Sequence, residues 1–394
     1  MKGLKSHLVP AMVVFMGLSL FAAGPASAKW WNLFKGKEKK PYRIGAIFDI
    51  SGKASALGIP EKQTVEMVVE EVNKAGGING RPVELVFYDT AMDAQKTINS
   101  VNKLIKKDKV LAIIGPSTSG VSMAIIETIQ NNEIPNISCA ARIDIIEPPQ
   151  KWVFKTPQTD KQAVGKILDY MQKKGIKKVA LMIVEGGFGS GGLIQLEAMA
   201  PQYGLEIVAD EKFSEDDTNV NTQLTKIRGT EAEALVVWCT DKGSAKVAVN
   251  MKQLGMEMPV YMSHGIATMK FIEQAREAAE GVIFPAGRLV VLDSLPESDP
   301  QKKVLAKYAA DFKAKYNATP DTFGGHAWDA IMVVIKAIEK AGDDINRIRD
   351  EIENVKNFVG IGGVFNFSKV DHNGLGPESL VMVKIVNGQW TYLE

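Results

Sequence analysis

Residues 110–119 read VLAIIGPSTS, and this stretch decides the fold class. Its first half, residues 110–114, is an apolar run typical of a strand buried on both faces, and residues 119–131 follow a helical pattern. A buried strand that leads through a short loop into a helix is the repeating unit of parallel α/β sheets. We therefore expect a parallel sheet whose loops, at the carboxyl ends of the strands, are placed to contact a ligand.

The same alternation of strand and helix extends outward from this stretch. Strands are predicted over residues 43–49 (RIGAIFD), 83–88 and 134–138, with helices over residues 61–74 and around Val101. The pattern restarts near Asp160, with strands over residues 178–184, 206–211, 234–238, 259–262 and 281–284 and helices over residues 162–174, 191–200 and 242–254. Two long helices follow over residues 302–316 and 323–340. The sequence thus predicts an α/β fold with two parallel-sheet units of similar size.

The carboxyl-terminal end has a different pattern. Strand segments at residues 363–367 and 378–386 flank Asp371-His372-Asn373-Gly374. An Asn-Gly pair between two strands is a strong turn signal, so we expect a hairpin here.

Composition limits the functional classes. A chain of 394 residues, 45% hydrophobic and 24% charged, suggests two or three globular domains. With 47 Lys and Arg against 46 Asp and Glu, the net charge is +1, which gives no indication of nucleic-acid binding. Two cysteines, Cys139 and Cys239, are too few for a disulfide scaffold or a cysteine zinc site, and we expect two buried free thiols.

The first 28 residues have the pattern of a signal peptide. Lys2 and Lys5 precede an apolar run over residues 8–23, and small residues up to Ala28 predict cleavage after Ala28 and a periplasmic location. The alternative, a transmembrane helix, is disfavoured because 16 residues that include Pro10 are too short to span a bilayer. Residues 29–41 are interpreted as a leader, and their tryptophans and lysines leave contact with a membrane surface open.

Several segments together resemble one family. They are Asp49-Ile50-Ser51-Gly52, residues 73–80 (NKAGGING), Tyr88-Asp89 and residues 113–119 (IIGPSTS). Over residues 42–394 the chain resembles the type I periplasmic solute-binding proteins of the leucine/isoleucine/valine-binding group.

The resemblance implies two doubly wound parallel-sheet lobes joined by three crossovers, with the ligand in the cleft between them. The crossovers are expected near residues 155–160, 284–288 and 361–367. Lobe 1 would comprise residues 42–157 and 286–362, and lobe 2 residues 158–285 with a hairpin over residues 363–394. The implied partners are a small-molecule ligand and an ABC permease, with no nucleic acid.

Ser117, Thr118 and Ser119 stand where a strand ends and a helix begins. The free N–H groups and partial positive charge of a helix amino terminus suit an anion, while Ser and Thr are also ordinary helix caps. The resemblance makes Ser119 a donor to a ligand carboxylate.

The loop after residues 134–138 faces the same predicted cleft. The resemblance gives Ala140 a backbone contact with the ligand, and it places Arg142 where the family usually has a threonine. Arg142 would either clamp a carboxylate or point to solvent.

Residues 187–192 (GFGSGG) match the G-x-G-x-x-G dinucleotide fingerprint, which makes an NAD-type enzyme the remote alternative. The pattern opens the second α/β unit instead of the first, which argues against that interpretation. In the family this loop carries an aromatic residue followed by glycine, so Phe188 would cover the ligand side chain.

Two positions depart from the family pattern. Leu57 stands where a pocket aromatic is common, and His264 lies at or beside the acidic residue that pairs with a ligand ammonium. A buried ammonium without a carboxylate is costly. Asp241 or Glu185 would substitute for that acid, although Asp241 is equally placed to cap a helix.

The sequence favours binding over catalysis. No H-E-x-x-H spacing and no G-x-S-x-G elbow occur, so no catalytic residue, metal or cofactor is predicted. The main hypothesis is a receptor for a carboxylate-bearing solute, a branched-chain or other amino acid, and the second is the same fold binding an aromatic or other organic acid without an ammonium.

Overall fold

The computed structural model describes residues 40–393. The predicted signal peptide and nearly all of the leader lie outside these residues. Within them, no helix combines the length and the apolar character that a membrane crossing requires.

The first sheet has five strands in the order β2-β1-β3-β4-β5, all parallel. These strands are β1 (Tyr42–Phe48), β2 (Val83–Asp89), β3 (Ile113–Ile114), β4 (Asn136–Ser138) and β5 (Val153–Lys155). Of the predicted strand at residues 110–114, only Ile113 and Ile114 are strand. The preceding residues still bond to β1, because the N–H of Leu111 donates to the carbonyl of Arg43.

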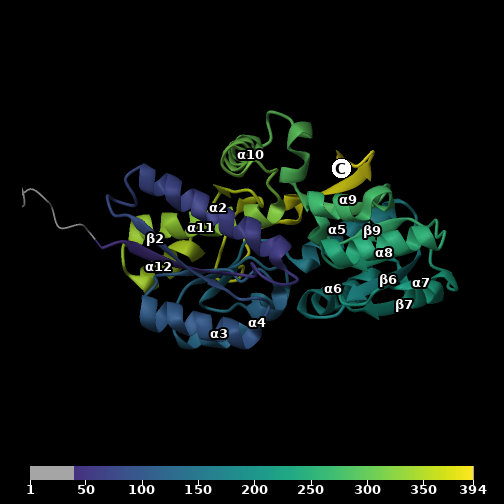
Figure 1. Ribbon diagram of the computed structural model, residues 1–394, viewed down its shortest axis with the longest axis horizontal. Helices are drawn as coiled ribbons and strands as arrows, with labels where there is room; N and C mark the ends of the chain where they lie inside the picture. Colours follow the sequence, from purple (N-terminus) through teal and green to yellow (C-terminus); the bar gives the residue numbers. More distant parts are fainter. Residues whose placement is uncertain (1–39, 394) are drawn as a thin grey trace, which may run out of the picture. The chain divides into compact units, whose positions relative to one another are not determined.

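Helices cover both faces of the first sheet (Figure 1). Alternate residues of β1 face opposite sides: Ala46 and Phe48 pack with α2 (Ser55–Lys74), α11 (Thr322–Ala341) and α12 (Ile345–Glu353). Ile47 packs with α3 (Ala94–Lys103) and α4 (Ser119–Asn131) on the other side. The two long predicted helices are α10 (Lys302–Tyr316), which contacts α2, and α11.

The second sheet has seven strands in the order β14-β13-β10-β9-β8-β6-β7. Its strands are β6 (Lys178–Val184), β7 (Glu206–Phe213), β8 (Ala234–Trp238), β9 (Val260–Met262), β10 (Ile283–Gly287), β13 (Leu380–Val386) and β14 (Gln389–Tyr392). All neighbours are parallel except at β13, which is antiparallel to both β10 and β14.

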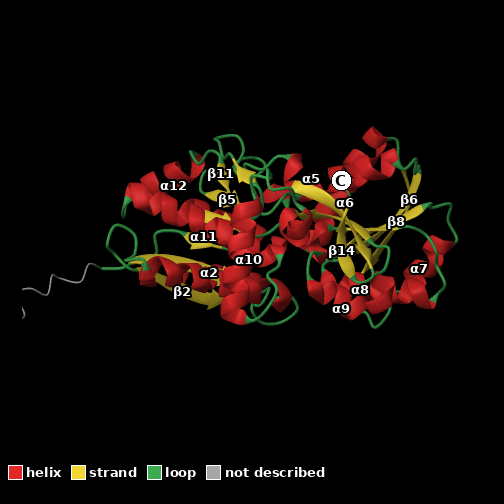
Figure 2. Cartoon of the chain, turned by 90° about the horizontal axis from the view of Figure 1, so that it is seen from above, coloured by secondary structure: helices red, strands yellow, loops and turns green. Residues whose placement is uncertain are grey.

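The second sheet is also covered on both faces, as Figure 2 shows from above. Leu181 and Ile183 of β6 pack with α5 (Asp160–Lys173) and α6 (Gly187–Met199). Residues of opposite orientation, such as Met182, pack with α7 (Asn221–Arg228), α8 (Asp241–Gln253) and α9 (Met269–Ala275). Two doubly wound α/β lobes, as predicted, are therefore present.

The predicted carboxyl-terminal hairpin was wrong in its pairing. The turn joins β13 to β14 through Asn387-Gly388, whose φ angles of 53° and 68° suit a type I′ turn. The segment at residues 363–367 contains β12 (Val364–Phe365), which pairs instead with β11 (Phe358–Val359). Both Asn-Gly pairs carry the same local signal, and only packing of the strands distinguishes them.

The chain passes between the sheets three times. β5 of the first sheet leads into α5 on the second, and β10 leads back to α10 and α11. Phe365, Phe367 and Leu375 still pack in the core of the first sheet, so the third connection follows Leu375, later than expected. The lobe boundaries given above stay predictions.

Candidate functional site

A cavity of about 60 Å³ is lined by loops and helix starts from both lobes. Its lining comprises Leu57, Ser117, Thr118, Ser119, Cys139, Ala141, Pro157, Phe188, Thr240, His264, Gly265, Thr322, Phe323 and His326. A groove of about 420 Å³ shares Leu57, Thr118, Ser119, Phe188 and Thr240 with this cavity. Six of the nine predicted ligand residues, namely Leu57, Ser117, Thr118, Ser119, Phe188 and His264, therefore line one cavity.

The first residues of four helices line this cavity. Ser119 begins α4, Phe188 is the second residue of α6, Thr240 precedes α8, and Thr322 begins α11. No side chain caps the amino termini of α4, α6 or α8. Each uncapped amino terminus presents free N–H groups and a partial positive charge, so together they suit an anion.

The three neighbouring hydroxyl groups have different partners. Ser117 donates to the Glu61 carboxylate and accepts from the N–H of Asp49 at 3.0 Å. Thr118 donates to the Asp49 carboxylate at 2.9 Å. The Ser119 hydroxyl has no hydrogen-bond partner among residues 40–393, although Ser119 is buried. Ser119 is therefore the hydroxyl of the three that is available to a ligand.

Ala140 and Arg142 do not line the cavity. The N–H of Ala140 donates to Ser138 Oγ at 3.2 Å, and Ala141, not Ala140, lies at the cavity. Arg142 pairs with Asp144 and donates through Nη1 to Ser190 Oγ at 2.8 Å. The guanidinium thus connects lobe 1 to the start of α6, and clamping a carboxylate would require it to leave these partners.

Three aromatic rings pack on one another here, and two of them, Phe188 and His264, line the cavity. The ring of Phe188 lies 5.6 Å from that of Trp238 and 5.8 Å from that of His264, and Trp238 and His264 are 5.9 Å apart. Each separation is within the range of favourable aromatic pairs. Leu57 adds an aliphatic side chain from α2.

His264 and His326 are buried and uncharged. Burial, assisted by the positive charge of Lys155 and, for His326, by the neighbouring His264, lowers the pKa of both imidazoles to about 3. Nδ1 of each ring is buried without a hydrogen-bond partner. Within the described residues, Nε2 of neither ring is hydrogen-bonded, so both rings keep one donor and one acceptor unused.

The two carboxylates that were predicted to replace the family's acid lie elsewhere. Asp241 is the first residue of α8 and is buried, and burial raises its pKa to about 7, but it does not line the cavity. Glu185 is exposed and borders the groove. Among the described residues that line the 60 Å³ cavity, none is Asp, Glu, Lys or Arg.

Comparison with known proteins identifies the family of the chain. The profile of the family described as "Periplasmic binding protein" matches residues 41–389. The chain belongs to the periplasmic binding protein family. An extracellular ligand-binding receptor from Rhodopseudomonas palustris HaA2 is 28% identical, with a TM-score of 0.85 over 90% of this chain and 100% of that one.

Two further relatives of this periplasmic binding protein have ligands in their names. The branched-chain amino acid transporter substrate-binding protein LivJ from Streptococcus pneumoniae, solved with isoleucine, is 27% identical with a TM-score of 0.79, covering 90% of this chain and 100% of that one. Leu/Ile/Val-binding protein homolog 3 of Brucella melitensis is 25% identical over 301 residues, 76% of this chain and 79% of that one.

The glycine pattern of residues 187–192 has a packing explanation in this periplasmic binding protein. A Cβ on Gly189 would overlap the carbonyl oxygen of Val184, and one on Gly192 would overlap the Trp238 ring. A Cβ on Gly187 would approach the N–H nitrogen of Gly120 at 2.7 Å. The glycines bring α6 close to its own sheet and to α4, and these contacts account for the pattern without a dinucleotide.

Sequence reasoning missed the residues that α11 brings to the cavity. Thr322, Phe323 and His326 lie at the start of α11, which was predicted as a long helix over residues 323–340 without a role in the site. The available signal was Asp321, which caps the helix by accepting from the N–H of Gly324 at 2.9 Å. That cap marks the start of a helix, but no local pattern places it near Ser119.

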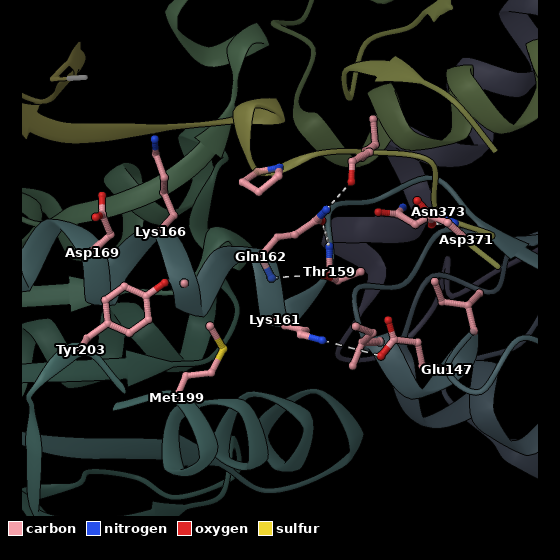
Figure 3. Close-up of a pocket in the computed structure, with 15 residues that line it drawn as sticks. Glu147, Thr159, Lys161, Gln162, Lys166, Asp169, Met199, Tyr203, Asp371 and Asn373 are labelled. Atoms are coloured by element: carbon pink, nitrogen blue, oxygen red, sulfur yellow. Dashed lines mark hydrogen bonds and ion pairs between the residues drawn. The ribbon is translucent and has the colours of Figure 1, made fainter. Parts of the chain in front are cut away.

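A larger hollow of about 520 Å³ lies on other elements of the chain (Figure 3). Lys161 pairs there with Glu147 at 3.9 Å, and Gln162 accepts from the N–H of Thr159 at 2.8 Å. The helix that starts here, α5, is closed by a complete capping box. It therefore offers no free amino terminus, and none of the predicted ligand residues lines the hollow.

Neither the cavity nor any other described part of the chain brings together three or more His, Cys, Asp or Glu in a metal-binding arrangement. Cys139 and Cys239 are both free and buried, as predicted. Burial raises the pKa of both thiols, which keeps them protonated and unreactive.

We predict that the histidine pair makes the ligand-free protein sensitive to acid. Each folded-state pKa is about 3, below the ordinary 6.5, so the unfolded chain binds more protons below pH 6.5. Stability should then fall as pH drops below 6.5, more steeply than in a His264→Gln/His326→Gln double variant, by about 1 kcal/mol per pH unit for each histidine.

Urea unfolding of both proteins between pH 5 and 8 measures this difference. The two curves should run parallel above pH 7, where folded and unfolded histidines are both neutral. Parallel curves down to pH 5 would contradict the prediction.

Proposed function

We propose that this protein is an exported receptor that binds a small carboxylate-bearing solute between its lobes and delivers it to an ABC permease. The observation that carries the proposal is the unpartnered Ser119 hydroxyl at a cavity where four helices begin. Hydroxyl and N–H donors in a water-excluded site form strong hydrogen bonds to a carboxylate. The names of relatives make branched-chain amino acids the first solutes to test.

Contacts between the lobes support a role for lobe closure. Lys53, just before α2, pairs with Asp216, just after β7. Nη1 of Arg142 donates to the carbonyl of Gly187 at 3.2 Å, and α4 packs against α6. In the proposal, a ligand held by both lobes stabilises this closed arrangement, which then presents a joint surface to the permease.

The location follows from the family and from the amino-terminal pattern together. A periplasmic binding protein needs export, and the predicted signal peptide, cleaved after Ala28, would direct it. The proposal assigns no catalytic step, metal or cofactor to the chain.

A thermal-unfolding panel tests the function. Branched-chain amino acids, 2-oxo acids, aromatic acids and NAD are added separately, and a true ligand at 100 times its Kd adds about 2.7 kcal/mol to stability. We expect at least one carboxylate to raise the melting temperature. The amide of that same acid is the matched control and should have no effect, because it lacks the anion.

Two outcomes contradict the proposal. Stabilisation by the amide as strong as that by the acid would show that no carboxylate site exists. Stabilisation by NAD, with no effect of any acid, would favour the dinucleotide alternative.

A further inference from the structure

The cavity provides no counter-charge for an ammonium group. Its described lining contains no carboxylate, and the uncapped amino termini of α4, α6 and α8 meet there. A buried ammonium in such a place loses its hydration without gaining an opposite charge. The same surroundings favour a carboxylate.

Three acidic side chains behind the lining, those of Asp49, Glu61 and Asp321, already accept hydrogen bonds from the protein. Asp49 accepts from Thr118 and from the N–H of Met92 at 2.6 Å, and Glu61 accepts from Ser117. Asp321 caps α11 through the N–H of Gly324. Burial raises the pKa of Asp321 to about 6 and that of Asp241 to about 7. Both carboxylate oxygens of Asp241 are buried without a hydrogen-bond partner, but Asp241 does not line the cavity.

Two polar side chains in the cavity have unused hydrogen-bonding capacity. The exposed fraction is 9% for His264 and 5% for His326, and both line the same 60 Å³ space as Ser119. Nδ1 of each has no partner. Because a space this small holds only a few heavy atoms, a head group bound at Ser119 lies within reach of both rings.

We propose that this site selects a carboxylate whose neighbouring substituent is an uncharged oxygen, as in a 2-oxo or 2-hydroxy acid, over the corresponding 2-amino acid. His264 and His326 are the specificity-determining partners of that oxygen. This inference rests on the proposed function, because it assumes that Ser119 and the helix amino termini hold the carboxylate. A neutral imidazole donates to a carbonyl oxygen, and it both donates to and accepts from a hydroxyl.

Matched sets of three acids test the inference in the wild-type protein. Each set shares one side chain: leucine, 4-methyl-2-oxopentanoate and 2-hydroxy-4-methylpentanoate form one, and the alanine and phenylalanine series form two more. In at least one set, calorimetry should give the 2-oxo or 2-hydroxy acid a Kd at least about tenfold lower than the amino acid.

The outcomes separate this inference from the proposed function. An amino acid that binds as tightly as its 2-oxo and 2-hydroxy counterparts, or more tightly, overturns the inference and leaves the carboxylate receptor intact. No binding by any acid of the three sets overturns both. Both results are obtained with the wild-type protein, so neither depends on whether a variant folds.

A pair of variants identifies the residue responsible. His264→Glu places a carboxylate at this position, so it should shift the preference between oxo acid and amino acid by about tenfold or more toward the amino acid. His264→Gln is the matched neutral variant, and because its amide can still donate and accept, its shift toward the amino acid should be smaller than that of His264→Glu. Equal shifts in the two variants would contradict the role given to His264, and circular dichroism verifies that both are folded.

Discussion

Gly189→Ala is expected to lower the free energy of unfolding by about 3 kcal/mol or more. The added Cβ would overlap the carbonyl oxygen of Val184, an atom of the preceding strand that cannot move without disturbing β6. Overpacking against backbone is costly because no side-chain rotation relieves it. Urea unfolding followed by circular dichroism measures the loss.

Gly120→Ala is the matched control. Gly120 also lies in the first turn of a helix, but a Cβ there meets nothing within 4 Å. The free energy of unfolding of the Gly120→Ala variant should differ from that of the wild-type protein by less than about 1 kcal/mol, since alanine is the better helix former. If Gly189→Ala were as mild as Gly120→Ala, the glycine pattern would not be a packing device, and a bound ligand would again be needed to explain it.

Ser119→Ala should weaken ligand binding by roughly 10- to 150-fold. A hydrogen bond to a charged group contributes ~1.5–3 kcal/mol, and each 1.4 kcal/mol is a factor of ten. The substitution leaves the N–H groups and the dipole of α4 in place. Because the hydroxyl has no partner in the described protein, stability without ligand should change little.

Ser122→Ala, on the same helix, is the control for this result. The Ser122 hydroxyl lies 2.8 Å from that of Ser138 and is buried, so its loss should reduce stability and leave affinity unchanged. Calorimetry with the acid found in the unfolding panel gives both affinities. If Ser119→Ala kept wild-type affinity and lost about 1 kcal/mol of stability, Ser119 would be a helix cap and not a ligand residue.

Much of the fold was predictable because it depends on local patterns. Three elements have the predicted bounds: the helix Ser119–Asn131 and the strands Lys178–Val184 and Ala234–Trp238. In each of them the pattern of apolar residues is clear and so is the residue at which the pattern begins. The start of α2 was predicted six residues late. The six missed residues include Pro60, which lies inside the helix near its amino end, where a missing N–H costs little.

The candidate site was predictable only in part. Ser119 follows from a strand end and a helix start that are adjacent in sequence, so local reasoning found it. His326 is brought to the same cavity from a helix more than 200 residues away, and its helical pattern is that of an ordinary core residue. Arg142 was predicted as a possible ligand contact. The sequence does not show that its guanidinium already pairs with Asp144 and donates to Ser190.

The packing of α11 on α2 has a consequence for how the chain matures. The first sheet is synthesised early, but α11 and α12, which cover one of its faces, emerge only after most of the second sheet. Until α11 and α12 have been synthesised, one face of the core around β1 stays uncovered. Contacts between residues so distant in sequence also form slowly. The lobe whose synthesis begins first is thus completed only near the end of synthesis, shortly before β13 and β14 complete the second sheet. The nascent chain stays incompletely folded for most of its synthesis, which fits passage through an export channel before the native structure forms.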